Sequence, residues 1–215
     1  MTGNDMLANL GLRVEDPAES VFTSSAKLDS LNLGQKTVVN MVDNAYLSEL
    51  QTIVAGKTAT PGSVYTTCTY DTAFSSAVPI RNGITGIYDA SSAKWCSMIE
   101  PGDVKRLENT YLAGSSANPI AFTFDEIIYV QPKASTSIDV WYLQAPTDLT
   151  ASGTECVLNP ALQELVLDFA ESQLWRMDAK ADRATSAYNS ALNVIKTLNE
   201  RYQAEKPEGI GTKGR

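Results

Sequence analysis

The sequence of 215 residues contains no histidine, and this absence restricts its chemistry more than any other feature. Histidine is the usual base beside a serine or cysteine nucleophile and a frequent ligand of zinc and iron. The composition therefore excludes Ser-His and Cys-His nucleophilic pairs and every metal site that needs an imidazole.

Cysteine is also scarce. Cys68, Cys96 and Cys156 lie 28 and 60 residues apart, and no two of them form a CxxC motif. This spacing does not fit a disulfide framework or a thiolate metal site. We expect three buried structural thiols in a protein made in a reducing cytoplasm.

Long apolar runs are missing as well. No stretch approaches the roughly 18 uninterrupted apolar residues of a membrane span, and residues 1–6 carry no basic start of a secretory signal. Hydrophobic residues still make up 43% of the chain, which is enough for a core. The length predicts one domain, or one domain with appendages.

Basic residues are the minority, 17 against 25 acidic ones, which gives a net charge of −8. Broad binding to nucleic acid depends on basic patches that face phosphates, so this balance argues against it. An acidic wall is compatible with nearby DNA that slides past without being held.

The first third of the chain predicts two helices. Thr2 or Asn4 caps a short helix with Met6, Leu7 and Leu10 on its apolar face, and Gly11 ends it. Residues 13–32 are polar and irregular, and a second helix is expected over residues 33–54.

A lysine and a hydroxyl follow glycine at Gly56-Lys57-Thr58, as at the end of a phosphate-binding loop. The pattern requires another glycine at position 51, where the chain has Gln51. We therefore interpret residues 56–62 as the end of a helix followed by a loop.

Strand and turn signals fill residues 63–146. Strands are expected over 64–70, 80–88 and 95–99, followed by a short helix that starts near residue 100. The clearest hairpin pairs residues 126–131 with 138–143. Trp95 and Trp141 are interpreted as core or interface residues.

The last third gives the strongest helical signal. Asn159 caps a helix that has Pro160 at its first position, and no Gly or Pro follows up to residue 204. Apolar residues recur in steps of three and four, which favours one continuous or kinked helix; a helical hairpin with a break near 178–182 uses the same pattern. The small and aromatic residues of its second half suit close packing on a neighbouring subunit: Ala181, Ala184, Tyr188, Ala191, Ile195, Leu198 and Tyr202.

Together these signals predict an α+β, mainly helical fold, with a long C-terminal helix or helical hairpin, N-terminal helices and a small inserted antiparallel β region. The expected domain covers residues 1–204, with a helical core at 1–56 and 159–204 and a β-rich insertion at 63–146. Residues 205–215 form a flexible tail. Its Ile210, Lys213 and Arg215 could anchor it on a partner.

Paired carboxylates are the remaining candidates for catalysis. Asp178 and Asp182, like Glu164 and Asp168, are spaced to share one helix face and could hold a metal ion. Basic residues interrupt the first pair, as on a solvated charged face. We expect no enzyme activity, no cofactor and no metal site.

The order of these elements resembles one protein family. An Asp-Met-Leu helix comes first. The motifs that carry the resemblance are LNLG at 31–34, IYVQP at 128–132, IDVWYLQAP at 138–146 and LNPALQEL at 158–165, with Ala184, Tyr188 and Leu192 further on. This arrangement resembles the head-to-tail adaptor proteins, also called neck or tail accessory proteins, of tailed bacteriophages, especially short-tailed ones.

The resemblance implies a virion structural protein at the portal vertex of the capsid, assembled in the host cytoplasm. It implies a ring of typically twelve copies under the portal, with genomic DNA passing through the channel without sequence-specific contacts. A downstream tail or nozzle protein would attach below, the C-terminal tail would lie along the portal, and no membrane is involved. Two alternatives stay open: a tail-completion or other ring-forming phage protein, and a metal-dependent hydrolase.

Overall fold

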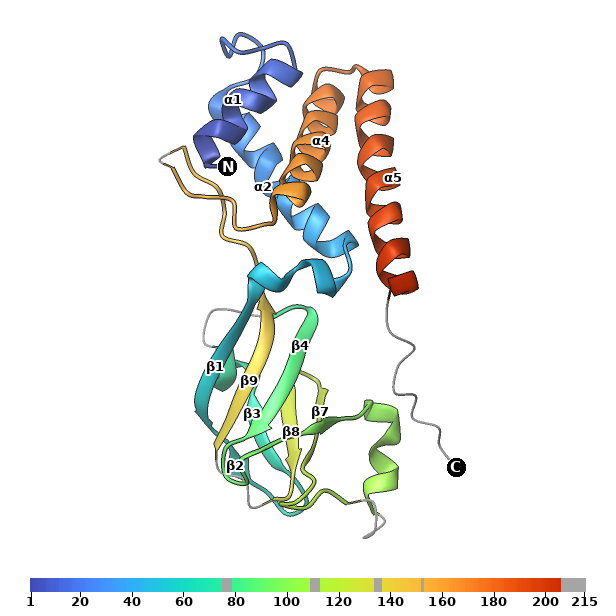
Figure 1. Ribbon diagram of the computed structural model, residues 1–215. Coiled ribbons are helices and arrows are strands. Elements are labelled where there is room, and N and C mark those ends of the chain that lie inside the picture. Colours follow the sequence, from blue (N-terminus) through green and yellow to red (C-terminus); the bar gives the residue numbers. More distant parts are fainter. Residues whose placement is uncertain (75–78, 109–112, 134–136, 152, 206–215) are drawn as a thin grey trace. The chain divides into compact units, whose positions relative to one another are not determined.

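The computed structural model describes residues 1–74, 79–108, 113–133, 137–151 and 153–205 (Figure 1). Contacts divide the chain into two compact units. The helical unit comprises Met1–Leu50 and Pro146–Arg215, and the β unit comprises Gln51–Ala145. The boundaries therefore fall at residues 50 and 146, where the sequence suggests 56 and 159 for the helical part.

Helix α1 (Gly3–Arg13) begins with a capping box, in which Thr2 and Asp5 each bond the other's backbone N–H. The expectation that Gly11 ends this helix is wrong, because α1 continues to Arg13. Gly11 is buried, and a Cβ there would lie 3.4 Å from the Asp16 carbonyl oxygen. The loop that follows α1 thus folds back over Gly11 at an ordinary van der Waals distance, which leaves space for a methyl group.

Helix α2 spans Ser24–Met41. Two predictions are therefore wrong: the irregular segment expected over 13–32 becomes helical from Ser24, and the helix expected over 33–54 ends at Met41. Thr23 caps it, and its buried face includes the polar residues Lys27, Ser30 and Gln35. Because these polar residues point inward, the spacing of apolar residues does not reveal the first turns of the helix. Two short 3-10 turns, Asn44–Tyr46 and Ser48–Leu50, follow it.

Helices α4 (Pro160–Met177) and α5 (Ala181–Glu205) form a hairpin. The Asn159 cap and Pro160 start are confirmed. The favoured continuous helix is wrong, and the alternative of a helical hairpin with a break near 178–182 is confirmed. The chain turns at Asp178–Lys180, where Ala179 has a left-handed φ of 56°. Phe169 meets Tyr188 across the hairpin with ring centroids 5.4 Å apart, so the row of apolar residues joins two facing helices.

Close helix contact holds the rest of the helical unit together. Gly34 of α2 lies against the backbone of Val166 in α4, where a Cβ would come within 2.7 Å of the carbonyl oxygen. Near the end of α5, Asn199 donates to the Met41 carbonyl at 3.0 Å, and the Tyr46 hydroxyl donates to the Leu198 carbonyl at 2.9 Å.

The β unit contains a four-stranded and a five-stranded sheet in the described residues. The first has the order β1 (Gln51–Thr58), β9 (Ser137–Gln144), β4 (Pro79–Asp89), β5 (Lys94–Trp95). The second has the order β2 (Thr60–Pro61), β3 (Thr66–Thr69), β8 (Ile127–Gln131), β7 (Ile120–Phe124), β6 (Ser97–Met98). Helix α3 (Tyr70–Phe74) and a 3-10 helix (Pro101–Glu108) complete the unit.

Both sheets contribute to one hydrophobic core. Ile138 and Val140 of β9 come from the four-stranded sheet, and Ile128 and Val130 of β8 come from the other. All four side chains are buried. The apolar residues alternate along β9, as expected for a strand with one face in a core.

The hairpin predicted from residues 126–131 and 138–143 is wrong. Strand β8 pairs with β3 and β7, whereas β9 pairs with β1 and β4. The chain changes sheets between the two strands. β8 forms its local hairpin with β7, which ends three residues before it, whereas β9 pairs with β1 and β4 from much earlier in the chain. The connection from Gln131 to Ser137 is also longer than the two-residue turn that joins the commonest hairpins.

The mainly helical fold class with a small β region is therefore wrong, since 46% of the chain is helical and 25% is strand, arranged in two multi-strand sheets. The segment Gly56-Lys57-Thr58 lies on β1 and does not end a helix. In the described part of the chain, no helix combines the length and apolarity that crossing a membrane requires.

Candidate functional site

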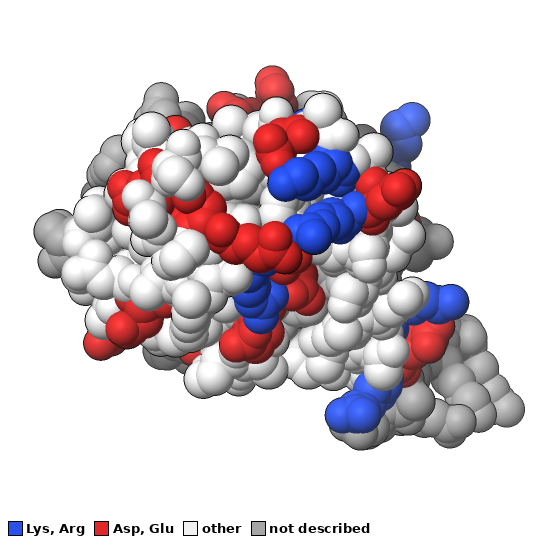
Figure 2. Space-filling model, turned by 90° about the horizontal axis from the view of Figure 1, so that it is seen from above, with Lys and Arg blue, Asp and Glu red and all other residues white. Residues whose placement is uncertain are grey.

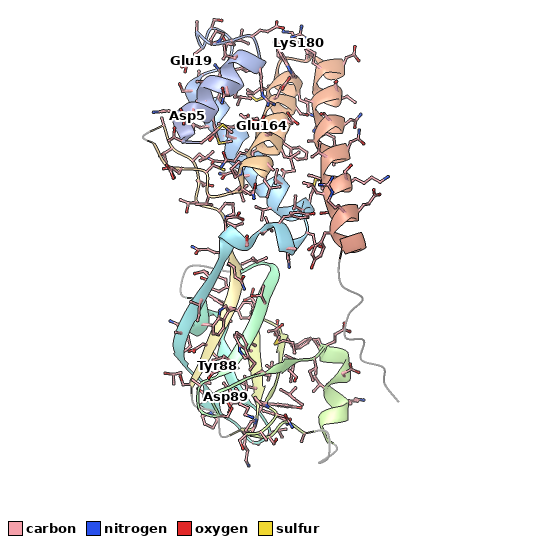
Figure 3. All side chains as sticks on the ribbon, viewed as in Figure 1. Asp5, Glu19, Tyr88, Asp89, Glu164 and Lys180 are labelled. Carbon is pink, nitrogen blue, oxygen red and sulfur yellow. The ribbon has the colours of Figure 1, made fainter. Side chains whose placement is uncertain are left out.

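The carboxylate pair Glu164 and Asp168 lies on α4, where Arg13 from the end of α1 reaches both (Figure 3 labels Glu164). The Arg13 guanidinium donates one hydrogen bond to each carboxylate, and Glu171 lies 3.8 Å away. Arginine has two donor edges for such contacts. The pair therefore joins two helices through one cation.

The second pair is separated by the turn. Asp178 caps the end of α4, and Asp182 lies in the first turn of α5, so the two do not share a helix face. Asp178 forms an ion pair with Lys180 at 2.7 Å. Within the described ranges, no group of three or more cysteine, aspartate and glutamate side chains is arranged to hold a metal ion.

A groove of about 360 Å³ runs beside the Arg13 cluster, lined by residues of α1, α4 and α5 that include Asp168, Glu171, Arg183 and Ser186. Arg183 donates to Glu15 at 3.0 Å across it. Basic and acidic side chains lie directly beside one another on the face seen in Figure 2. Acidic and basic side chains thus pair with one another both in the Arg13 cluster and along the groove.

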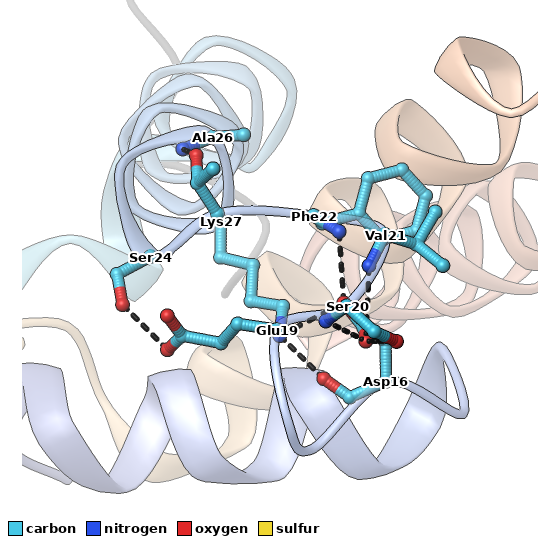
Figure 4. Close-up of polar contacts among 9 residues, drawn as sticks. Asp16, Glu19, Ser20, Val21, Phe22, Ser24, Ala26 and Lys27 are labelled. Atoms are coloured by element: carbon cyan, nitrogen blue, oxygen red, sulfur yellow. Dashed lines mark hydrogen bonds and ion pairs between the residues drawn. The ribbon is translucent and has the colours of Figure 1, made fainter.

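Sequence reasoning missed a buried ion pair, Asp16 and Lys27 (Figure 4). Each side chain is 2% exposed, and the Lys27 Nζ lies 3.4 Å from the Asp16 carboxylate and bonds its carbonyl oxygen. The Asp16 carboxylate also accepts bonds from the backbone N–H groups of Ser20, Val21 and Phe22. This arrangement fixes the loop between α1 and α2.

The pKa of Asp16 reflects two opposing effects. Burial raises it, but the hydrogen bonds from Phe22, Ser20 and Val21 outweigh burial and hold the pKa far below its usual value. Asp16 is therefore a charged structural group. The polar, proline-containing segment 13–32 offered no periodic signal for it.

The three cysteines are free and buried. Burial raises the pKa of each thiol, and for Cys96 the pKa rises to about 12. Thiols of this kind remain protonated near neutral pH and are poor nucleophiles.

The structure brings most of the predicted subunit-packing row into the chain's own helical unit. Ala184, Ala191 and Ile195 are buried there, and Tyr202 contacts Tyr46 edge-on at 6.1 Å. Ala181 is exposed. Packing on a neighbour stays a prediction, and the three buried members have little surface left for it. Ile210, Lys213 and Arg215 lie outside the described residues.

A further cluster was noted from the sequence only as two tryptophans. Trp95 and Trp141 lie on the four-stranded sheet with ring centroids 4.5 Å apart, and Tyr88 completes the cluster. The sequence interpretation left their role open between core and interface. Trp95 is exposed, so it is not a core residue.

Three of the candidate acidic residues, Glu164, Asp168 and Asp178, make ion pairs within the helical unit, which is a structural role. The family comparison is more specific. The chain matches the family model described as SU10 adaptor protein over residues 1–209 and belongs to this family of bacteriophage head-to-tail adaptors. It is thus a structural protein of the virion at the head-to-tail junction. A comparison with curated proteins found no match.

Proposed function

We propose that this adaptor forms a ring of twelve copies under the portal, extends the DNA channel and provides the platform for a downstream tail or nozzle protein. Membership of the adaptor family over residues 1–209 is the observation that carries the proposal. The free chain is monomeric, and the ring assembles on the portal in the host cytoplasm.

The C-terminal tail makes the portal contact in this proposal. Helix α5 ends at Glu205, and the ten residues beyond it include Ile210, Lys213 and Arg215. Ile210 supplies an apolar anchor, and the two basic side chains pair with portal carboxylates. Ordering such a segment on the ring links assembly to the presence of the portal.

Neighbouring adaptors pack along the helical hairpin. Ala184, Ala191 and Ile195 hold α5 within its own chain, so the members with free surface, Ala181 above all, face the neighbour. The net charge of −8 suits a channel wall that repels DNA phosphates and lets the genome pass without sequence-specific binding.

Native mass spectrometry of the full chain, alone and mixed with the portal ring of the same bacteriophage, tests this proposal. We expect a monomer alone and one adaptor per portal subunit in the mixture. The absence of a complex with the portal, or a sixfold ring of the chain alone, contradicts the proposal and favours a tail-completion role.

Deletion of residues 206–215 tests the tail. Because α5 ends before the cut, we expect an unchanged circular dichroism spectrum together with weaker portal binding. Replacing Lys213 and Arg215 with glutamine, while Ile210 is kept, separates the charges from the apolar anchor. Unchanged portal binding by the truncated chain would remove the tail from the mechanism.

A further inference from the structure

The four-stranded sheet carries apolar residues on the face that points away from the core. Along β9, Ile138, Val140 and Tyr142 are buried, so Trp141 between them points to the opposite face. The strand register places Ile53 of β1 and Gly86 of β4 beside Trp141. It also places Trp95 of β5 beside Tyr88 (Figure 3 labels Tyr88, at the end of β4). We call these five residues the aromatic face.

The rings of the aromatic face hold one another in place. Trp95 and Trp141 lie at 49° with centroids 4.5 Å apart, and Tyr88 meets them edge-on at 5.6 and 6.4 Å. A Cβ on Gly86 would lie 2.8 Å from the Trp95 ring, so this ring rests on bare backbone. The cluster therefore has a defined shape.

This shape stays open to solvent. Trp95 is 56% exposed and Ile53 is 46% exposed. The outer face of an antiparallel sheet is ordinarily polar, and a contiguous apolar patch on it marks a site of interaction. The aromatic face thus has the character of a binding surface.

The chemistry of the face favours a cation. Aromatic ring faces carry partial negative charge and attract guanidinium or ammonium groups. Asp139 of β9 pairs in register with Tyr88, so it lies on the same face as the rings. One oxygen of its carboxylate accepts a hydrogen bond from the Gly56 N–H of β1 at 2.6 Å, and the carboxylate still adds a negative charge to this face. A partner's basic side chain over Trp95 would thus meet the rings directly and this charge from across β4.

The chain itself shows the pattern at its third tryptophan. Buried Trp175 has Lys180 over its ring at 4.6 Å and Arg183 at 4.8 Å. Among the residues that the structure describes, no basic side chain occupies the equivalent position over Trp95 or Trp141. The aromatic face therefore has room for a cation from another protein.

We propose that the aromatic face binds an arginine or lysine side chain of a partner protein, carried on an extended segment that lies across β4 and β9. The inference rests on the proposed function: the portal contact is assigned to the C-terminal tail, so the partner here is the downstream tail protein. A second copy of this chain, at a net charge of −8, is the less complementary occupant.

Peptide titration tests the chemistry directly. The full chain, with 15N-labelled indoles, is titrated with acetyl-Gly-Arg-Gly-Arg-Gly-amide and with the matching peptide that carries neutral citrulline. We expect the arginine peptide to bind about two to five times more tightly, seen as movement of the Trp95 and Trp141 indole signals at lower peptide concentration, since a cation–π contact at an exposed site is worth about that factor. Trp175 is the internal control, because its ring already carries two cations. Equal responses to the two peptides, or none, overturn the proposal.

A second experiment uses the chain assembled on its portal. Trp95→Leu should leave portal binding unchanged and weaken binding of the downstream tail protein by about five- to thirty-fold. Phe124→Leu is the matched control, since Phe124 is an exposed aromatic residue on the other sheet. Unweakened binding of the tail protein by Trp95→Leu overturns this inference and leaves the proposed function standing. Failure of the unaltered chain to bind the portal counts against the proposed function, and the peptide titration then decides the aromatic face independently.

Discussion

Two of the buried helical glycines, Gly34 and Gly11, predict opposite effects for the same substitution. Gly34 lies in the middle of α2, where a new Cβ would come 2.7 Å from the Val166 carbonyl oxygen of α4. Gly11 lies in α1, where the nearest atoms to a new Cβ are at 3.4 Å, an ordinary contact. Both glycines are in helices, so alanine carries the same intrinsic benefit at each position.

The magnitudes follow from two opposing terms. Replacing a helical glycine with alanine gains about 1 kcal/mol of helix propensity. Forcing a methyl group against packed backbone costs about 1–3 kcal/mol, because neither helix can move without repacking the core. Gly34→Ala should therefore lower the free energy of unfolding by up to about 2 kcal/mol, whereas Gly11→Ala should raise it by about 0.5–1 kcal/mol.

Thermal unfolding followed by circular dichroism at 222 nm compares the two variants with the unaltered chain. In a protein of this size, 1 kcal/mol corresponds to a Tm shift of about 2–4 °C. We expect a lower Tm for Gly34→Ala and a higher one for Gly11→Ala. If Gly34→Ala raises the Tm as much as Gly11→Ala does, the close approach of α2 and α4 is refuted.

Two further predictions follow from the buried ionisable groups. Hydrogen bonds to Asp16 outweigh its burial and hold its folded-state pKa far below the unfolded value, so its contribution to stability is present above about pH 4 and is lost as the pH falls below it. Urea unfolding of Asp16→Asn should show lower stability than the unaltered chain at pH 7 and a gap that narrows below pH 4; a constant gap contradicts the assignment. Burial raises the pKa of the Cys68, Cys96 and Cys156 thiols, so iodoacetamide at pH 8 should label them slowly in the folded protein and rapidly in urea. Fast labelling of any thiol in the folded chain, measured by intact mass, would disagree with its burial.

Local signals were read correctly where the chain itself supplies the partner. Thr2 and Asn159 cap α1 and α4, since an N-cap needs only the next few backbone N–H groups. The strands around residues 66–69 and 137–144 also lie where β-branched and aromatic residues predict them.

Features that depend on residues distant in the sequence could not be predicted from local patterns. The α4–α5 turn contains Ala179 in a left-handed conformation where glycine is the usual signal, so the sequence favoured a continuous helix over a hairpin with a break near 178–182. Strand β1 begins at Gln51 because β9 pairs with it from about 90 residues away, and a local apolar pattern cannot report that partner. In the false hairpin between β8 and β9, the same reason applies to β9, whose partners β1 and β4 lie far back in the sequence, whereas β8 pairs with its neighbour β7.

In the candidate site, too, local spacing could be predicted from the sequence and long-range contacts could not. Sequence spacing correctly placed Glu164 and Asp168 on one helix, but Arg13 reaches them from 151 and 155 residues away. Trp95 and Trp141 were recognised as two aromatic residues, whereas their contact depends on β4 lying between β5 and β9 in the sheet. Family membership followed from the order of the elements along the chain, which survives errors in their individual boundaries.

The pairing of Gln51 with Leu143 has a consequence for how the helical unit folds. These residues lie at the two ends of the β unit, so a folded β unit replaces a loop of 95 residues, Gln51–Ala145, with a short closed connection between α2 and α4. Loop-closure entropy grows as about (3/2)RT ln n. Residues 42–50 and 146–159 remain in the connection, so it shortens from roughly 118 to roughly 23 residues, and the cost of joining α2 to α4 falls by roughly 1.5 kcal/mol. Folding of the β unit therefore favours folding of the helical unit through the shortened chain connection alone.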